Sequence, residues 1–152
     1  MPRNFFKIKL WSDGGVKRSS EGEILRAIGV LIEDENENTT QYSLLINKKK
    51  NHQELEAMAL TEGLEIVCIY FNEDCKNIEV EINTDYKSLA DIMDPENNGA
   101  DPNKLGKDKV VLGLVPYLRK LESNFRKVNY KFVNSGENKA DKICSEAFNR
   151  CY

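Results

Sequence analysis

The 152-residue sequence has no long apolar run, a single histidine and no closely spaced pair of cysteines. A membrane-spanning helix needs roughly 20 consecutive apolar residues, so we expect no membrane span. The N-terminus lacks an apolar segment with a small-residue cleavage site, which favours a cytoplasmic protein. Cys68, Cys75, Cys144 and Cys151 form no Cys-x-x-Cys pair, and His52 is the only histidine. We therefore expect no structural zinc site, and cysteines that are free and act as small apolar groups.

The composition is that of an ordinary globular protein, with 40% hydrophobic and 31% charged residues. The net charge of −3 argues against a broad electrostatic attraction to nucleic acid, although it leaves room for a local basic patch. The chain contains no internal repeat and no low-complexity linker. We expect one domain, over residues 1–152, that acts as a monomer.

The alternation of apolar and polar residues predicts five strands and four helices. The first three strands are joined by short connections, which favours an antiparallel meander. The whole order predicts an α/β (mixed α+β) fold, in which helices pack on a mixed sheet. The expected strands cover residues 4–13, 23–34, 40–48, 77–85 and 127–133, and the expected helices cover 51–71, 86–93, 110–125 and 138–151.

Glu56 lies on the wrong face of the helix expected at residues 51–71. On a helical wheel started at Leu55, Glu56 falls at about 100°, in the middle of the apolar arc. A carboxylate that points at a core is costly unless it is paired, protonated or bound to a cation. The alternative is a glutamate that reaches water from the open first turn. Glu54 falls on the polar arc and is interpreted as a surface residue.

Asp13 and Asp85 each stand where a predicted strand ends. Asp13 precedes two glycines, which is a common turn signal, and Asp85 precedes a helix, where it could be an N-cap. If the two strands are parallel neighbours, their carboxylates converge at one edge of the sheet and Glu56 can approach from the covering helix. Three like charges at that distance need a cation, and oxygen ligands suit Mg²⁺ or Mn²⁺.

Four stretches of the chain resemble the ribonuclease H family in their order and spacing: "SDGG", "HQELEAMAL", "INTDYKSL" and "NKADKICSEA". Members of that family have a strand that ends in Asp-Gly, a helix that opens with Glu and small residues, and a strand end with Thr-Asp. Their final helix follows Asn-x-x-Ala-Asp. The resemblance runs from about Phe6 to Phe148. It implies a ribonuclease H-like fold, with a five-stranded mixed sheet and helices on both of its faces.

The resemblance also implies an activity and four catalytic carboxylates. Asp13, Glu56, Asp85 and Asp141 match the family's metal ligands, and two Mg²⁺ or Mn²⁺ ions about 4 Å apart would flank the scissile phosphate. One ion would activate the attacking water and the other would stabilise the leaving 3′ oxygen. Asp13 would bridge both ions, Glu56 and Asp85 would complete one site, and Asp141 the other. The reaction would cut the RNA strand of an RNA/DNA hybrid and leave 5′-phosphate and 3′-hydroxyl ends.

Residues around these carboxylates are candidates for contact with nucleic acid. Two glycines leave the backbone bare where a strand would pass, and the residues before Glu56 match the family's phosphate pocket and minor-groove contacts. The alternatives are a solvated lysine turn at residues 48–50 and, for the histidine, a polar residue at a helix start. The predicted contacts are Gly14, Gly15, Lys49, Asn51, His52 and Gln53.

The chain departs from the family in the loop before the last helix. That loop, "FVNSGENKAD", has no histidine where many members carry one, and this bears on the turnover rate more than on the reaction. The loop at residues 94–108 replaces the basic helical protrusion of some members. Two further hypotheses remain open: a weak or inactive module of this fold that binds nucleic acid or protein, and a nuclease of the same fold that acts on DNA.

Overall fold

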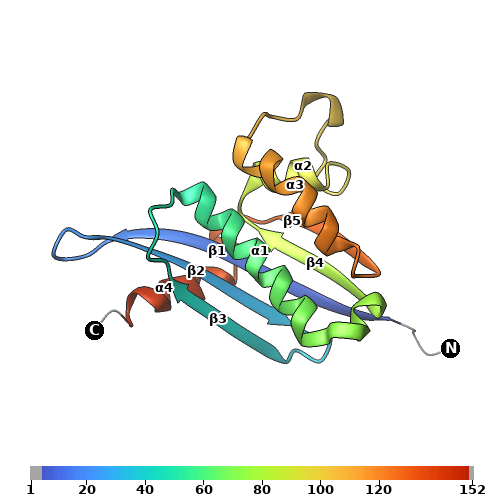
Figure 1. Ribbon diagram of the computed structural model, residues 1–152, viewed down its shortest axis with the longest axis horizontal. Coiled ribbons are helices and arrows are strands. Elements are labelled where there is room, and N and C mark those ends of the chain that lie inside the picture. Colours follow the sequence, from blue (N-terminus) through green and yellow to red (C-terminus); the bar gives the residue numbers. More distant parts are fainter. Residues whose placement is uncertain (1–4, 151–152) are drawn as a thin grey trace.

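The computed structural model describes residues 5–150, and within them five strands form one mixed sheet (Figure 1). The order across the sheet is β3-β2-β1-β4-β5. β1 pairs antiparallel with β2, and β2 with β3, whereas β4 runs parallel to both β1 and β5. The predicted meander and mixed sheet are confirmed. The strands are β1 Phe6–Arg18, β2 Ile24–Glu33, β3 Thr39–Leu45, β4 Ile78–Thr84 and β5 Lys127–Phe132.

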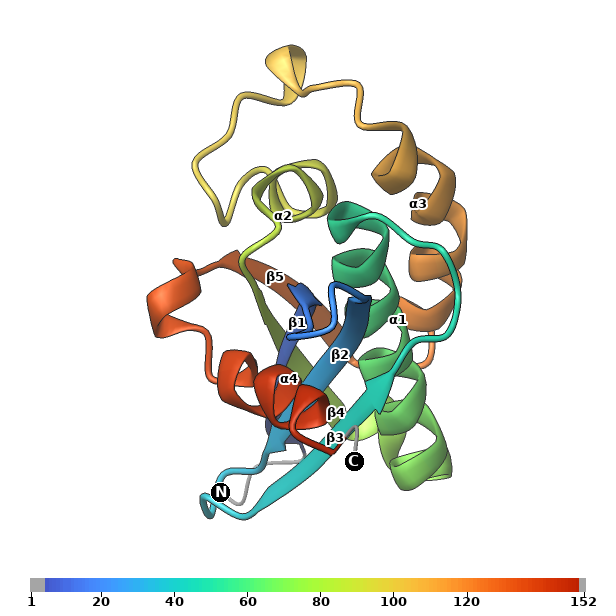
Figure 2. The same cartoon turned by 90° about the vertical axis from the view of Figure 1, so that its left-hand side faces the viewer.

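Helices cover both faces of the sheet, as predicted. Figure 2 shows α1 and α3 on one face and α4 on the other. The main core lies under α1 and α3, and a smaller cluster around Ala27 and Phe148 lies under α4. None of the helices within residues 5–150 combines the length and apolar character needed to cross a membrane. The helices are α1 His52–Phe71, α2 Lys87–Met93, α3 Lys109–Glu122 and α4 Ala140–Phe148, with 3₁₀ segments at Asn72–Asn77, Pro102–Lys104 and Ser135–Glu137.

The cysteines that the structure describes are free, as expected. Cys75 and Cys144 are buried, and Cys68 is partly buried. The fourth, Cys151, lies outside the described residues, as do the first residue of the strand expected at 4–13 and the last of the helix expected at 138–151.

Strand β1 does not end at Asp13, so the predicted strand end is wrong, and so is the alternative of a turn there. Its pairing with β4 stops at Ser12 opposite Thr84, but its pairing with β2 continues to Arg18 opposite Ile24. The two glycines are therefore part of an extended strand. Local sequence could not show this, because the hydrogen bonds that keep the chain extended come from β2.

Gly14 has a packing role that explains the missing side chain. A Cβ atom at this position would lie 2.5 Å from the backbone carbon of Leu55 and 2.6 Å from the backbone nitrogen of Glu56. The first turn of α1 can rest against β1 only because nothing projects from Gly14. This close approach also brings Glu56 next to Asp13.

Gly14→Ala is expected to destabilise the protein by about 1–3 kcal/mol, because the added methyl group meets backbone atoms that cannot move aside alone. Urea unfolding followed by circular dichroism measures the change. Gly113→Ala is the matched control: a Cβ there meets nothing within 4 Å, and alanine in a helix is favoured over glycine by up to about 1 kcal/mol. Equal stabilities of Gly14→Ala and the unmodified protein would contradict the packing role.

The loop between α2 and α3 covers the outer edge of β5. Asp94 Oδ2 accepts a hydrogen bond from the Tyr130 amide at 3.0 Å. Asn98 Oδ1 accepts one from the Phe132 amide, and Asn98 Nδ2 donates to the Tyr130 carbonyl, both at 2.8 Å. These side chains satisfy backbone groups that a sixth strand would otherwise pair with, which protects the edge.

Candidate active site

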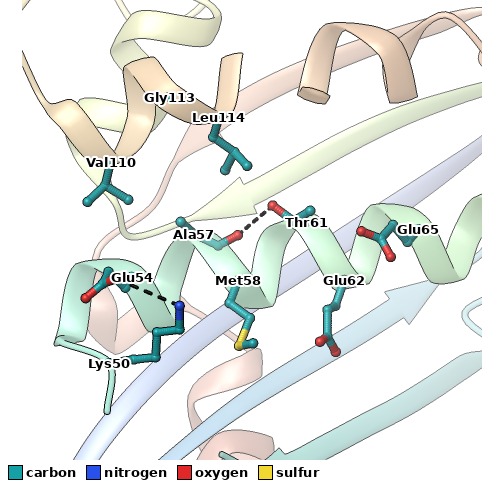
Figure 3. Close-up of a pocket in the computed structure, with 10 residues that line it drawn as sticks. All are labelled: Lys50, Glu54, Ala57, Met58, Thr61, Glu62, Glu65, Val110, Gly113 and Leu114. Atoms are coloured by element: carbon teal, nitrogen blue, oxygen red, sulfur yellow. Dashed lines mark hydrogen bonds and ion pairs between the residues drawn. The ribbon is translucent and has the colours of Figure 1, made fainter. Parts of the chain in front are cut away.

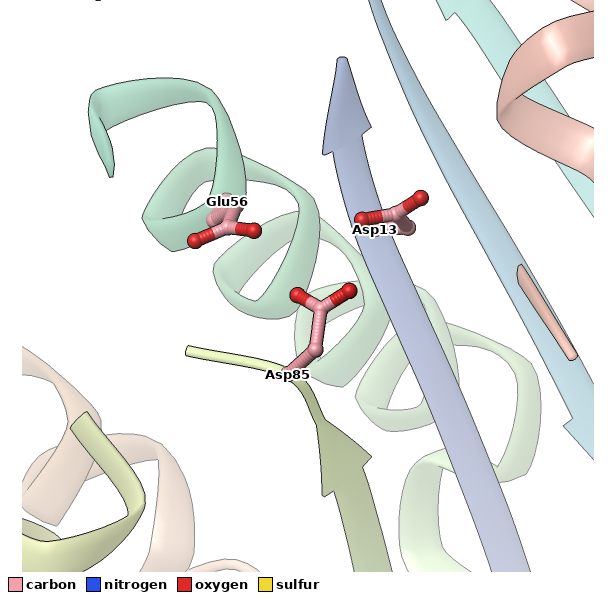
Figure 4. Close-up of side chains that lie close together, drawn as sticks. All are labelled: Asp13, Glu56 and Asp85. Atoms are coloured by element: carbon pink, nitrogen blue, oxygen red, sulfur yellow. The ribbon is translucent and has the colours of Figure 1, made fainter. Parts of the chain in front are cut away.

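Three of the four predicted catalytic carboxylates meet at the end of the parallel strands (Figure 4). Asp13, Glu56 and Asp85 each offer one oxygen, and these atoms all lie within 4.8 Å of one another. Asp13 and Asp85 are the residues that follow the last parallel pair, Ser12 and Thr84. Glu56 reaches them from α1. The three carboxylates therefore converge as predicted, although only β4 ends here and β1 continues beyond Asp13.

A capping box sets where α1 begins and therefore where Glu56 points. Asn51 Oδ1 accepts a hydrogen bond from the Glu54 amide at 2.8 Å, and Glu54 Oε1 accepts one from the Asn51 amide at 3.1 Å. Glu54, interpreted from the sequence as a surface residue, has this local structural role. The spacing Asn-x-x-Glu at a helix start is a sequence signal for it.

Asp13 and Glu56 are buried, with relative exposures of 7% and 8%. Burial, followed by the charges of Asp85 and Asp141, raises the pKa of Asp13 from 3.8 to about 8. Burial, followed by a hydrogen bond to Asp85 and the charges of Asp85 and Asp13, raises the pKa of Glu56 from 4.5 to about 9. The alternative that Glu56 reaches water is wrong. In the absence of a cation, protons relieve the repulsion between these groups.

Asp85 is not the N-cap of α2, which was its alternative role. The N-cap residue is Tyr86. Asp85 Oδ1 is buried and has no hydrogen-bond partner among the described residues. A buried carboxylate oxygen without a donor is costly, and here it belongs to a cluster of oxygen ligands of the kind that Mg²⁺ and Mn²⁺ prefer. The residues present therefore fit a divalent cation.

Asp141 borders the same site and interacts with Asp13, but it is not one of the three residues whose oxygens all lie within 4.8 Å of one another. It lies in the first turn of α4, is exposed, and lines a cavity of about 530 Å³ together with Asp13 and Asp85. Its charge contributes to the raised pKa of Asp13. Three of the four predicted carboxylates, Asp13, Asp85 and Asp141, thus line one cavity, and Glu56 lies next to two of them.

Asn138 anchors the start of α4 beside Asp13, a role that the sequence reading missed. Its Nδ2 donates to the Ser12 carbonyl at 2.8 Å, and its Oδ1 accepts from the Ala140 amide at 3.0 Å. Asn138 is buried, with 4% relative exposure. The stretch "NKAD" was the available signal, but the partner of Asn138 is 126 residues away in the sequence.

Three of the six predicted nucleic-acid contacts line this cavity. Gly14, Gly15 and His52 line it, whereas the side chain of Asn51 serves the helix cap. Lys49 and Gln53 are exposed on either side of the start of α1. Whether these residues contact nucleic acid stays a prediction.

A second cavity, of about 390 Å³, lies between α1 and α3 (Figure 3). Its acidic residues Glu54, Glu62 and Glu65 all come from α1. They are spread over 11 residues, or about 16 Å of helix, so they do not converge on one cation. The cavity with Asp13 is therefore the better candidate for metal chemistry.

The strand order and the helices on both faces are those of the ribonuclease H fold, and the acidic cluster lies where the parallel pairing of β1 and β4 stops. Solved structures with this fold match nearly the whole chain. No protein-family model matches the sequence, and a comparison with curated proteins found no significant match.

Three of the similar structures illustrate the match. One is the N-terminal RNase H domain of Rv2228c from Mycobacterium tuberculosis, fused to maltose binding protein. It is 20% identical, the match covers 95% of this chain and 94% of the chain of that structure, and the TM-score is 0.69. RNase H1 from Halobacterium salinarum is 17% identical, with coverages of 94% and 98% and a TM-score of 0.69. LC11-RNase H1, isolated from compost by a metagenomic approach and solved with an RNA/DNA hybrid, is 21% identical, with coverages of 94% and 97% and a TM-score of 0.72.

Proposed function

We propose that this protein is a ribonuclease H, a metal-dependent endonuclease that hydrolyses the RNA strand of RNA/DNA hybrids and leaves 5′-phosphate and 3′-hydroxyl ends. The observation that carries the proposal is the group of Asp13, Glu56 and Asp85, with its unpartnered Asp85 oxygen, at the point where the parallel pairing of β1 and β4 stops. The hybrid bound to the similar LC11-RNase H1 supports the choice of substrate.

The four carboxylates would hold two divalent cations, Mg²⁺ or Mn²⁺. Asp13, Glu56 and Asp85 would bind one ion, and Asp13 and Asp141 the other. Such ions supply Lewis acidity, a water of lowered pKa and a counter-charge for the leaving oxygen. For binding, Asp13 and Glu56 must release the protons that burial makes them retain.

The chain's own residues fix the site before substrate arrives. The cap formed by Asn51 holds the start of α1, and Asn138 holds the start of α4 against β1. The cavity lies beside the start of α1, at His52, and runs along α4 to Ser145 and Asn149, and it would give a nucleic-acid backbone access to the carboxylates. Such preorganisation lowers the cost of assembling the reacting groups.

The proposal is tested with labelled RNA/DNA hybrid, duplex DNA and duplex RNA, each with Mg²⁺ and with Mn²⁺. We expect cleavage of the RNA strand in the hybrid and no cleavage in metal-free buffer. Glu62→Gln, a carboxylate removed from α1 outside the site, is the control and is expected to cleave normally. Preferred cleavage of duplex DNA would favour a DNA nuclease of this fold. No cleavage, together with no binding of Mn²⁺ at millimolar concentration, would favour a non-catalytic module.

A further inference from the structure

His52, the only histidine of the chain, contacts a catalytic carboxylate directly. Its Nε2 lies 3.0 Å from Glu56 Oε1. The two residues are four apart in the first turns of α1, so the helix itself places their side chains on one face. The His52 side chain is 58% exposed and that of Glu56 9%, so the ring lies at the mouth of the cavity and the carboxylate behind it.

A carboxylate can only accept hydrogen bonds, so the contact requires a proton on Nε2 of the imidazole whenever Glu56 is ionised. Nδ1 is then the unprotonated ring nitrogen of the neutral ring. The bond occupies one oxygen of Glu56 and leaves the other for a cation. The bond is thus one of the contacts that set the orientation of the Glu56 carboxylate next to Asp13 and Asp85.

We propose that His52 is a positioning residue, which holds the Glu56 carboxylate in the orientation that binds the divalent cation. The inference rests on the proposed metal site, and it differs from the role in nucleic-acid contact that the sequence suggested for His52. Partners that hydrogen-bond to a metal ligand orient it, and their loss typically weakens metal affinity or activity by 10–100-fold.

The test is the affinity for Mn²⁺, measured by isothermal titration calorimetry at pH 8 without nucleic acid. His52→Ala is expected to weaken binding by about 10-fold or more. His52→Gln keeps an N–H donor with similar reach and is expected to bind within about threefold of the unmodified protein. Glu62→Gln, on the same helix, is expected to bind Mn²⁺ unchanged.

A second measurement uses the unmodified protein and does not depend on the folding of any variant. Because the chain has one histidine, its imidazole gives a single set of ¹⁵N signals in a nuclear magnetic resonance spectrum. With saturating Mg²⁺, we expect a proton on Nε2 of the ring. A ring with a proton on Nδ1 and none on Nε2 would contradict the proposal.

Hybrid cleavage separates this role from substrate binding. If His52 positions Glu56, the activity of His52→Ala falls at low Mn²⁺ and recovers at saturating Mn²⁺, while KM for the hybrid is unchanged. A higher KM for the hybrid with normal Mn²⁺ affinity would overturn the proposal and make His52 a nucleic-acid contact. If the unmodified protein bound Mn²⁺ but cleaved no hybrid, the proposed function would fail while the calorimetry still tested His52.

Discussion

Asp13→Asn is expected to lower the rate of hybrid cleavage by at least about 1,000-fold, which corresponds to about 4 kcal/mol of lost transition-state stabilisation. Asp13 is the one carboxylate that contributes both to the close group with Glu56 and Asp85 and to the pair with Asp141. An amide has one oxygen ligand and no charge, so both proposed cation sites are weakened together. No other single substitution in the site has this double effect.

The rate is measured under single-turnover conditions with excess protein, so that slow release of product does not hide the chemical step. Asp74→Asn is the matched control, because it makes the same chemical change at an exposed position in the 3₁₀ segment after the far end of α1. Its rate is expected to equal that of the unmodified protein. Cleavage by Asp13→Asn within tenfold of normal would remove Asp13 from the catalytic role and with it the proposed mechanism.

Much of the site could be predicted from residues whose chemistry conflicts with their position. Glu56 on an apolar arc needed a proton or a cation to compensate its charge, and the structure buries it beside two more carboxylates, Asp13 and Asp85, which makes that need greater. The alternation in residues 77–85 puts Ile78, Val80 and Ile82 on one face of the strand, and the structure buries all three in the core, since period-2 patterns follow directly from strand geometry. These signals are local, so a single sequence is enough to detect them.

What the sequence could not show depends on partners that are distant along the chain. The extension of β1 beyond Asp13 requires β2, and the anchoring of α4 requires Asn138 to find the Ser12 carbonyl. The packing of α1 against Gly14 could not be predicted either, because a glycine needed for helix packing looks the same in sequence as one needed for a turn. Turn propensity is a property of a few residues, and tertiary contacts override it.

The metal-free protein is expected to lose stability as the pH rises from about 4 to about 9, because burial and mutual repulsion hold the pKa of Asp13 near 8 and that of Glu56 near 9. In the unfolded chain these groups titrate near 4. Below pH 4 both carboxyl groups are protonated in the folded and in the unfolded protein, so the stability that their raised pKa values contribute is fully present. Above it the unfolded state releases protons that the folded state retains, so the free energy of unfolding falls until the folded pKa values are passed.

Asp13→Asn is therefore expected to be more stable than the unmodified protein in EDTA at pH 8, by roughly 1–3 kcal/mol, and equally stable at pH 4. Removing one acid from the cluster relieves the repulsion on Glu56 and Asp85 without leaving a cavity. For a chain of this size, each 1 kcal/mol shifts the midpoint of thermal unfolding by about 2–4 °C. Thermal unfolding in EDTA at several pH values measures the effect, with Asp74→Asn as the control that should follow the unmodified protein throughout.

Addition of Mg²⁺ at pH 8 should make the unmodified protein more stable than Asp13→Asn, the reverse of the order in EDTA. A cation that binds only the folded state stabilises it by mass action, by about 2.7 kcal/mol at 100 times its dissociation constant, and Asp13→Asn should gain little because its site is incomplete. The same carboxylate would then weaken the metal-free fold and strengthen the metal-bound one. Equal stability of the two proteins in EDTA at pH 8, with no separate response to Mg²⁺, would mean that the Asp13 carboxylate neither repels its neighbours nor binds a cation.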